Sequence, residues 1–183
     1  MDPIDILSEF YDRRSKAFKI LVAHGKQVAE KALIAAGQVS HLKPDLNFIA
    51  NAAMLHDIGI LQTNSPGLGC NGRHPYICHG ILGRDLLEKI GFSEYGLVCE
   101  RHIGVGISAD DVRQFKLPLP ARDMLPITIE EQLICYADSF FSKNGNNGKN
   151  AKEKTVKQIL RGLKRYGTDK VQRFWSWVEM FER

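Results

Sequence analysis

Apolar side chains recur every three to four positions over much of the chain, which is the spacing of one face of a helix. Within residues 4–36 this period is carried by Ile20, Leu21, Val28, Leu33 and Ile34. Gly37 follows and is expected to stop this first helix. A second predicted helix begins near Pro44, where Asp45 adds favourable negative charge, and it ends with Gly59 as a C-terminal cap.

Two stretches rich in glycine and proline interrupt the helical pattern. Residues 62–77 and 104–127 are therefore predicted loops. The first loop lies between candidate ligands, so we expect it to line a pocket mouth or act as a lid. Helices are expected at 78–90 and 94–103, and a further helix opens at Thr128, where Thr128-Ile129-Glu130-Glu131 fits a capping box.

The C-terminal part of the chain predicts a linker and two more helices. Residues 143–150 are polar and rich in glycine and asparagine, and helices are expected at 151–166 and 168–181. The apolar residues expected to dock the last helix on the core are Phe174, Trp175, Trp177, Val178 and Phe181. No segment alternates like a half-buried strand, so the predicted fold class is all-α.

The chain has 183 residues, of which 44% are hydrophobic and 25% charged, as is typical of a globular domain. No apolar stretch approaches the roughly 20 residues that cross a bilayer, and the acidic N-terminus lacks a signal-peptide pattern. We therefore expect a cytoplasmic protein with no membrane partner. We divide it into a domain at 1–142 and a basic helical extension at 143–183 that packs on the same domain.

The net charge of +4 is unevenly distributed. Residues 143–183 hold 11 Lys and Arg against 4 Asp and Glu, whereas residues 1–142 hold 14 against 17. Such a basic segment attracts phosphate-bearing molecules. No nucleic-acid-binding motif accompanies the charge, so a solvated helical face is the first interpretation and no nucleic-acid partner is expected.

Six imidazole and carboxylate side chains occur in a defined order: His24, His56, Asp57, His79, His102 and Asp138. Neutral imidazole and carboxylate suit iron, manganese, zinc or magnesium. The chain also has four cysteines but no C-x-x-C pair, so a thiolate zinc site is not indicated.

The motif Leu55-His56-Asp57-Ile58-Gly59 and the residues around it resemble the HD superfamily of metal-dependent phosphohydrolases. The other matching pieces, spread over residues 20–142, are His24-Gly25-Lys26-Gln27-Val28-Ala29, His79-Gly80-Ile81-Leu82-Gly83, Glu100-Arg101-His102 and Tyr136-Ala137-Asp138. The resemblance implies that His24, His56, Asp57 and Asp138 hold a first ion. It also implies that His79 and His102 complete a second site and that Asp57 bridges the two.

The resemblance therefore implies two divalent or mixed-valent transition-metal ions. Iron and manganese are the first candidates, with zinc, nickel, cobalt and magnesium as alternatives. A water between two such ions is acidified into a hydroxide nucleophile, and the ions neutralise charge on a phosphoryl group. The expected reaction is hydrolysis of a small phosphorylated metabolite, with a nucleotide as first candidate and Asp57 at the catalytic centre.

Cations that bind the substrate phosphate are harder to place. The family often has a lysine directly after His-Asp-x-Gly, but this chain has Ile60. The remaining candidates for substrate binding are Arg73, His74, Arg84, Arg101 and Lys143.

Two alternatives to the hydrolase stay open. The same six ligands occur in mixed-valent di-iron oxygenases that cleave inositol or organophosphonates, and dioxygen consumption would distinguish that class from anaerobic phosphate release. The other alternative is a non-catalytic binding module, which the complete ligand set disfavours. The sequence is also compatible with association of the chain into a homodimer.

Overall fold

The chain folds into packed helices, as the sequence predicts. The structure is a computed structural model that describes residues 2–143 and 153–182. The helices are α1 (Pro3–Phe10), α2 (Lys16–Gln38), α3 (Leu46–Leu55), α4 (His79–Lys89), α5 (Ser93–Arg101), α6 (Ala109–Gln114), α7 (Ile129–Asp138), α8 (Val156–Leu163) and α9 (Thr168–Phe181). Short 3-10 turns lie at Ser40–Leu42, Ile58–Gln62, Pro66–Leu68, Tyr76–Cys78 and Lys164–Tyr166. In the described part of the chain, the strands β1 (Asn64–Ser65) and β2 (Cys70–Asn71) form one small antiparallel sheet.

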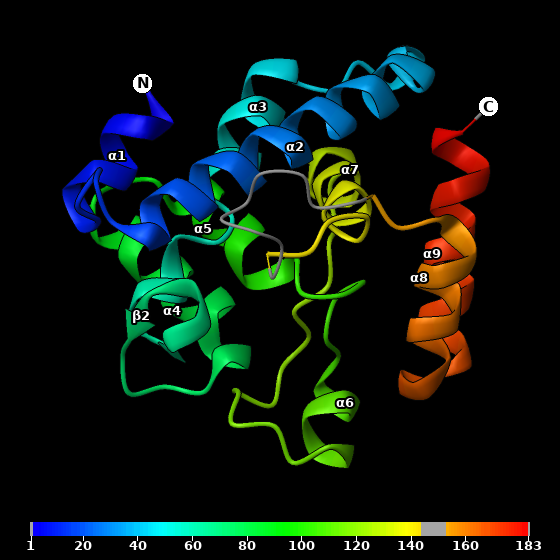
Figure 1. The fold of residues 1–183 in the computed structure, drawn as a ribbon. Coiled ribbons are helices and arrows are strands. Elements are labelled where there is room, and N and C mark those ends of the chain that lie inside the picture. The colour runs from blue at the N-terminus through cyan, green and yellow to red at the C-terminus, as the bar shows by residue number, and fades with distance from the viewer. Residues whose placement is uncertain (1, 144–152, 183) are drawn as a thin grey trace.

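The long helix α2 crosses the upper part of the molecule in Figure 1 and packs against α3 and α7. The main core cluster joins these three helices to α9 through residues such as Val28, Ile49, Leu133 and Phe174. A second cluster joins α1, the start of α2 and the turn after α3. The region where the end of α3 meets the middle of α2 thus lies between the two core clusters.

The predicted helix over 4–36 is wrong in one respect, because it breaks after Phe10. Asp12 accepts a hydrogen bond from the amide of Arg14 at 2.8 Å, and the Ser15 hydroxyl caps α2 by accepting from the amide of Phe18 at 3.1 Å. Such short polar side chains compete with the helical ladder and start a new helix instead. The break turns Tyr11 into the interior, where it is buried.

Neither predicted glycine stop acts as one. The helix α2 continues past Gly37 to Gln38, and α3 ends at Leu55, before Gly59. Gly59 serves close packing, since a Cβ on it would lie 2.1 Å from the carbonyl oxygen of His79 and 2.3 Å from the nitrogen of Gly83. It lets α4 approach the turn that follows α3.

The other predicted boundaries agree to within a few residues. Thr128 and Glu131 form the predicted capping box at the start of α7. The predicted loop at 104–127 also contains α6, a helix of only six residues that Ser108 and Asp111 cap. Residues 144–152, which include most of the predicted linker, lie outside the described residues. The predicted helix over 151–166 begins later than expected, because residues 153–155 are not helical and Thr155 caps α8 at Val156.

The last helix packs its aromatic side on the main core cluster. Phe174, Trp177 and Phe181 are buried, whereas Trp175 is 47% exposed. Within residues 2–143 and 153–182, no helix has the length and apolar character needed to cross a membrane.

Candidate metal centre

The six histidines and aspartates of the predicted ligand set come from five different helices and meet at one place. His24 lies in the middle of α2, and His56 and Asp57 directly follow α3. His79 is the first residue of α4, His102 follows α5, and Asp138 is the last residue of α7. The four histidines and Asp57 are at most 3% exposed, and the Asp138 side chain is 15% exposed. Helix ends therefore supply most of the cluster, which frees its side chains from regular helical directions.

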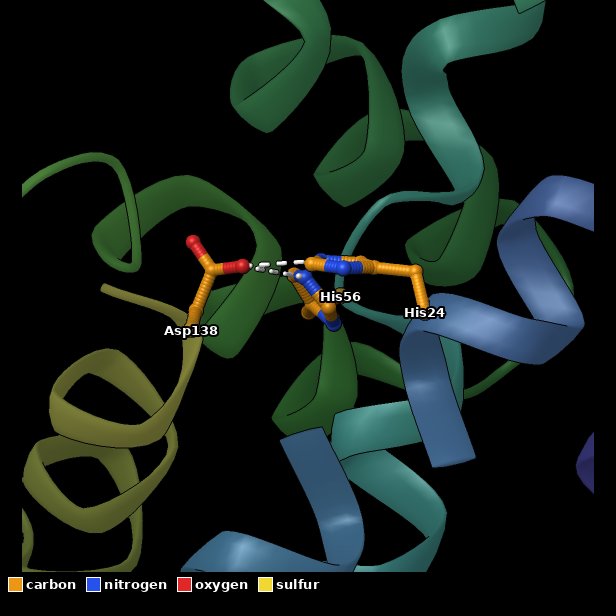
Figure 2. A group of neighbouring side chains, drawn as sticks. All are labelled: His24, His56 and Asp138. Atoms are coloured by element: carbon orange, nitrogen blue, oxygen red, sulfur yellow. Dashed lines mark hydrogen bonds and ion pairs between the residues drawn. The ribbon is translucent and has the colours of Figure 1, made fainter. Parts of the chain in front are cut away.

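Three of these residues form a first group (Figure 2). Asp138 Oδ1 lies 2.8 Å from His24 Nε2 and 3.5 Å from His56 Nε2. One ligand atom from each of the three residues lies within 4.8 Å of the others, which is a spacing that a single ion can bridge.

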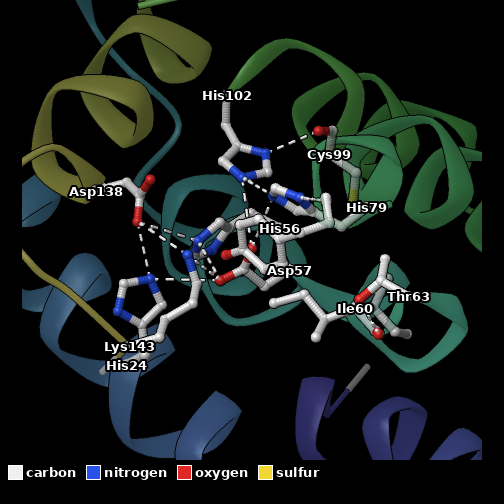
Figure 3. Close-up of polar contacts among 12 residues, drawn as sticks. His24, His56, Asp57, Ile60, Thr63, His79, Cys99, His102, Asp138 and Lys143 are labelled. Carbon is white, nitrogen blue, oxygen red and sulfur yellow. Dashed lines mark hydrogen bonds and ion pairs between the residues drawn. The ribbon is translucent and has the colours of Figure 1, made fainter. Parts of the chain in front are cut away.

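Asp57 stands between this group and the remaining two histidines (Figure 3). Its Oδ2 lies 3.4 Å from His24 Nε2 and 3.2 Å from His56 Nε2. Its Oδ1 lies 3.3 Å from His79 Nε2 and 3.5 Å from His102 Nε2. Each carboxylate oxygen thus faces a different pair of imidazoles.

Backbone carbonyls fix the orientation of three of the four imidazole rings. The Nδ1 atoms of His56, His79 and His102 each lie 2.7 Å from the carbonyl oxygen three residues earlier, in Ala53, Tyr76 and Cys99. A carbonyl oxygen only accepts hydrogen bonds, so each Nδ1 must carry the proton. Each Nε2 is then turned into the cluster, and it is a lone-pair donor when the ring is neutral.

Four buried nitrogen and oxygen atoms of the cluster lack a hydrogen bond among the described residues, although Lys143 Nζ lies 2.8 Å from one of them, Asp57 Oδ2. Within the described residues, no hydrogen bond of normal geometry reaches either oxygen of Asp57, Nδ1 of His24 or Nε2 of His56. Unpaired buried polar atoms are costly and rare. A cation among them would satisfy the inward-facing atoms, so the residues present fit a metal centre.

Opposite charges dominate the electrostatics of the cluster. Burial alone would raise the pKa of Asp57 and Asp138, but His56 and Lys143 hold both pKa values well below the usual range. Burial opposes the charged form of His56, yet Asp57 and Asp138 raise its pKa to about 10. Burial lowers the pKa of His79 to about 3, so this ring stays neutral. Both carboxylates therefore remain ionised, and a metal ion that binds there would displace the proton of His56.

Lys143 is the predicted substrate-binding residue that the structure brings to the cluster. Its Nζ lies 2.8 Å from Asp57 Oδ2 and 3.9 Å from Asp138 Oδ1. Burial would lower its pKa, but the two carboxylates raise it, so the amine stays charged. A cavity of about 440 Å³ opens beside Lys143 and is also lined by Ser65, Gly67, Leu68, Tyr76, Phe141 and Ser142.

The other four predicted substrate-binding residues lie elsewhere. The Arg84 guanidinium pairs with Glu88 at 2.7 Å and with Glu100 at 2.5 Å, and Arg101 pairs with Glu131 at 2.7 Å. These arginines thus neutralise carboxylates of the scaffold. Arg73 and His74 are exposed in the loop between β2 and α4.

Sequence reasoning missed two residues that shape the centre. The Tyr76 ring lies 4.6 Å from the His79 ring between centroids, and it lines the cavity. The buried Tyr11 hydroxyl donates to the carbonyl oxygen of Ile58 at 2.7 Å and accepts from the amide of Leu61 at 2.7 Å, which braces the turn after Asp57. The position of Tyr76, three residues before a predicted ligand, was the only signal that could have indicated a role.

This fold and side-chain cluster define a helical metal-binding domain, and comparison with known proteins identifies its family. A model of the HD domain matches residues 21–142, about two thirds of the chain. The chain therefore belongs to the HD domain family, whose members bind divalent metal ions.

Three relatives are similar to part of the chain. An uncharacterized protein of Methanocaldococcus jannaschii is 36% identical over 96 residues, which are 52% of this chain and 49% of that protein. A tRNA (cytidine(56)-2'-O)-methyltransferase of Thermoplasma volcanium is 32% identical over 123 residues, 67% of this chain and 32% of that enzyme. The enzyme of the same name from Picrophilus torridus is 35% identical over 99 residues, 54% of this chain and 25% of that enzyme. The chain thus spans half or less of each relative, and no solved structure matches significantly.

Proposed function

We propose that this protein is a dinuclear metal-dependent phosphohydrolase that acts on a small phosphorylated metabolite, with a nucleotide as the first candidate. The observation that carries the proposal is the position of Asp57, whose two oxygens face two different pairs of imidazoles within 3.5 Å. In this proposal His24, His56 and Asp138 hold one ion, His79 and His102 hold the other, and Asp57 bridges them. Iron and manganese suit this nitrogen and oxygen donor set best.

Two bound divalent ions would acidify a water between them and neutralise negative charge on a phosphoryl group. The residues of the chain supply position and order. The carbonyls of Ala53, Tyr76 and Cys99 hold three rings in one tautomer, so that no ring has to reorient. Burial of the cluster excludes bulk water, which strengthens every interaction between charges in it.

Lys143 is the residue we propose for holding the substrate phosphate. It stands between the cluster and the cavity of about 440 Å³, and its amine is charged. This volume falls within the range of about 300 to 1,000 Å³ that small-molecule sites occupy. A substrate in the cavity would place its phosphate at Lys143 and the scissile bond next to Asp57.

The protein is purified without added metal, its metal content is measured, and it is then screened for activity on phosphorylated compounds. Phosphate release is measured under anaerobic conditions from mononucleotides, dinucleoside polyphosphates and sugar phosphates. Two relatives are named for modification of tRNA, so RNA fragments with terminal phosphates belong in the screen. Asp57→Ala should abolish release and lower the metal content. Dioxygen consumption with an Fe(II)/Fe(III) resonance signal and no phosphate release would instead support the di-iron oxygenase.

A further inference from the structure

One exposed side of α8 and of the turn after it is cationic. Its exposed basic residues, which we call the basic face, are Lys157, Arg161, Lys164 and Arg165. Steps of four and three residues place them on one side of a helix. The opposite side packs on the core through Val156, Ile159, Leu160 and Leu163. The helix is thus amphipathic, with its apolar side covered and its basic face open to solvent.

The charges of the basic face are not neutralised by the fold. Among residues 2–143 and 153–182, no carboxylate lies within ion-pair distance of Lys157, Arg161 or Lys164. Glu153, four residues before Lys157, is engaged by Lys31 at 2.6 Å, and Arg165 donates to the carbonyl of Gly162. Solubilising lysines are normally interspersed with acidic residues, whereas an aligned set of one sign attracts a polyanion.

Two exposed aromatic rings adjoin the basic face. Tyr166 is 51% exposed and Phe115 is 39% exposed, and their centroids lie 6.1 Å apart at 80°. Both rings line a cavity of about 490 Å³ between α6 and the start of α9. Its neutral polar lining residues are Ser108, Gln114 and Thr168. Exposed rings next to cations are the combination by which proteins hold single-stranded nucleic acid.

Three carboxylates at this cavity decide which part of a nucleic acid could enter it. Asp110 pairs with Arg113, while Asp111 and Asp169 both pair with Lys170. Lys164 and Arg165 of the basic face also line this cavity and suit phosphate oxygens, whereas the carboxylates can accept hydrogen bonds from the amino groups of an uncharged base. The phosphates therefore suit the basic face, and a base suits the cavity.

We propose that the basic face, together with Phe115 and Tyr166, binds single-stranded RNA, with phosphates along α8 and a base against the rings. The base must be unpaired, because stacking on a side chain requires an exposed face. The Thr168 and Gln114 side chains at the cavity can hydrogen-bond a ribose 2′-hydroxyl, which favours RNA over DNA. In Figure 1, α8 and α9 stand together at one side of the molecule.

Fluorescence anisotropy with a labelled ten-nucleotide oligoadenylate tests the charged part of the surface. Three or four phosphate contacts predict that the logarithm of affinity falls against the logarithm of salt with a slope of about −2 to −3. Replacing Lys157, Arg161 and Lys164 together by alanine should weaken binding at least about tenfold and remove about 2 from the slope. The matched control replaces Arg14, Lys19 and Lys89, which are also exposed. Equal losses in the two triple variants would overturn the proposal, because binding would then be a property of net charge.

The aromatic part has its own test, in which melting curves verify that each variant is folded. Tyr166→Ala should weaken oligoadenylate binding about tenfold with an unchanged salt slope, since stacking releases no counterions. Duplex RNA and inorganic polyphosphate should compete poorly. Competition by either one as strong as by the oligoadenylate would refute base stacking. Equal affinity for a labelled ten-nucleotide oligodeoxyadenylate would refute the assignment to RNA.

Discussion

His79 Nε2 and His102 Nε2 face each other at 3.1 Å, while the Nδ1 of each ring is engaged by a backbone carbonyl. With both Nδ1 atoms protonated, neutral rings would direct two lone pairs at one another. Such a contact is repulsive unless a proton or a cation lies between the nitrogens or beside them. Asp57 Oδ1 completes the same group at 3.3 and 3.5 Å, so the atoms that would hold a second ion are already assembled.

Removal of either of these histidines should reduce the metal content selectively. His79→Ala or His102→Ala is expected to lower occupancy from about two ions per chain towards one, because the group of His24, His56 and Asp138 stays complete. Mass spectrometry of metal content and circular dichroism check the result. His41→Ala, at an exposed histidine, is the control. Unchanged occupancy in both variants would refute the two-ion proposal.

Gly59→Ala should separate α4 from the turn that carries Asp57. The added methyl would lie 2.1 Å from a backbone oxygen, so the free energy of unfolding should fall by about 3 kcal/mol and second-site metal affinity should fall with it. Gly37→Ala is the matched control, since a Cβ there meets nothing within 4 Å. It should stabilise α2 by about 1 kcal/mol in chemical denaturation.

Replacing Lys143 by methionine should change substrate binding, whereas replacing Arg84 by methionine should change the stability of the fold. Lys143→Met is expected to raise KM for a phosphorylated substrate about tenfold or more, because the charge beside the cavity is lost. Arg84→Met should leave KM unchanged and lower the free energy of unfolding, because buried Glu100 loses one of its two arginine partners. A raised KM in Arg84→Met would indicate that Arg84 binds the substrate after all.

The ion pair of Asp111 and Lys170 should make the free energy of unfolding depend on pH in the acidic range. Burial would raise the pKa of Asp111, but hydrogen bonds from Lys170 and Ser108 lower it below 3.8. A lowered folded-state pKa gives stabilisation that is present above about pH 4 and is lost as the pH falls through the lowered pKa. Asp111→Asn should therefore cost about 2 kcal/mol at pH 7, and its difference from the native protein should shrink below pH 4.

Urea denaturation at several pH values measures this difference. Asp110→Asn is the control, since the Asp110 side chain is 87% exposed and pairs with Arg113 in the same helix. It should leave both the stability and its pH dependence unchanged. An equal, pH-independent loss in both variants would contradict the assigned role of the buried pair.

Local signals in the sequence predicted what depends on neighbouring residues. The capping box at Thr128 needs only four consecutive positions, and the structure confirms it. The all-α fold follows from helical periodicity in the same way. The ordered set around His56-Asp57 indicated the family because every expected member was present, and the comparison confirmed that family.

Contacts between distant segments explain what the sequence could not predict. The role of Gly59 depends on the backbone of α4, which is unknown until α4 is placed. Arg84 and Arg101 looked like phosphate ligands because they are close to histidines in sequence, yet their partners are Glu100 and Glu131. The burial of Tyr11 at the break after Phe10 depends on a turn that lies 47 residues further along.

The contact of Tyr11 shows that the turn after His56-Asp57 is stabilised by a residue outside the segment that matches the HD family. The hydroxyl belongs to a residue outside 21–142, yet it holds the peptide groups directly after the His-Asp pair. A fragment trimmed to the family boundaries would lose both hydrogen bonds of the Tyr11 hydroxyl and uncover the apolar residues Ile58 and Ile60 of this turn. Residues 2–11 therefore brace the metal-ligand cluster through Tyr11, and shortened versions of the chain should keep them.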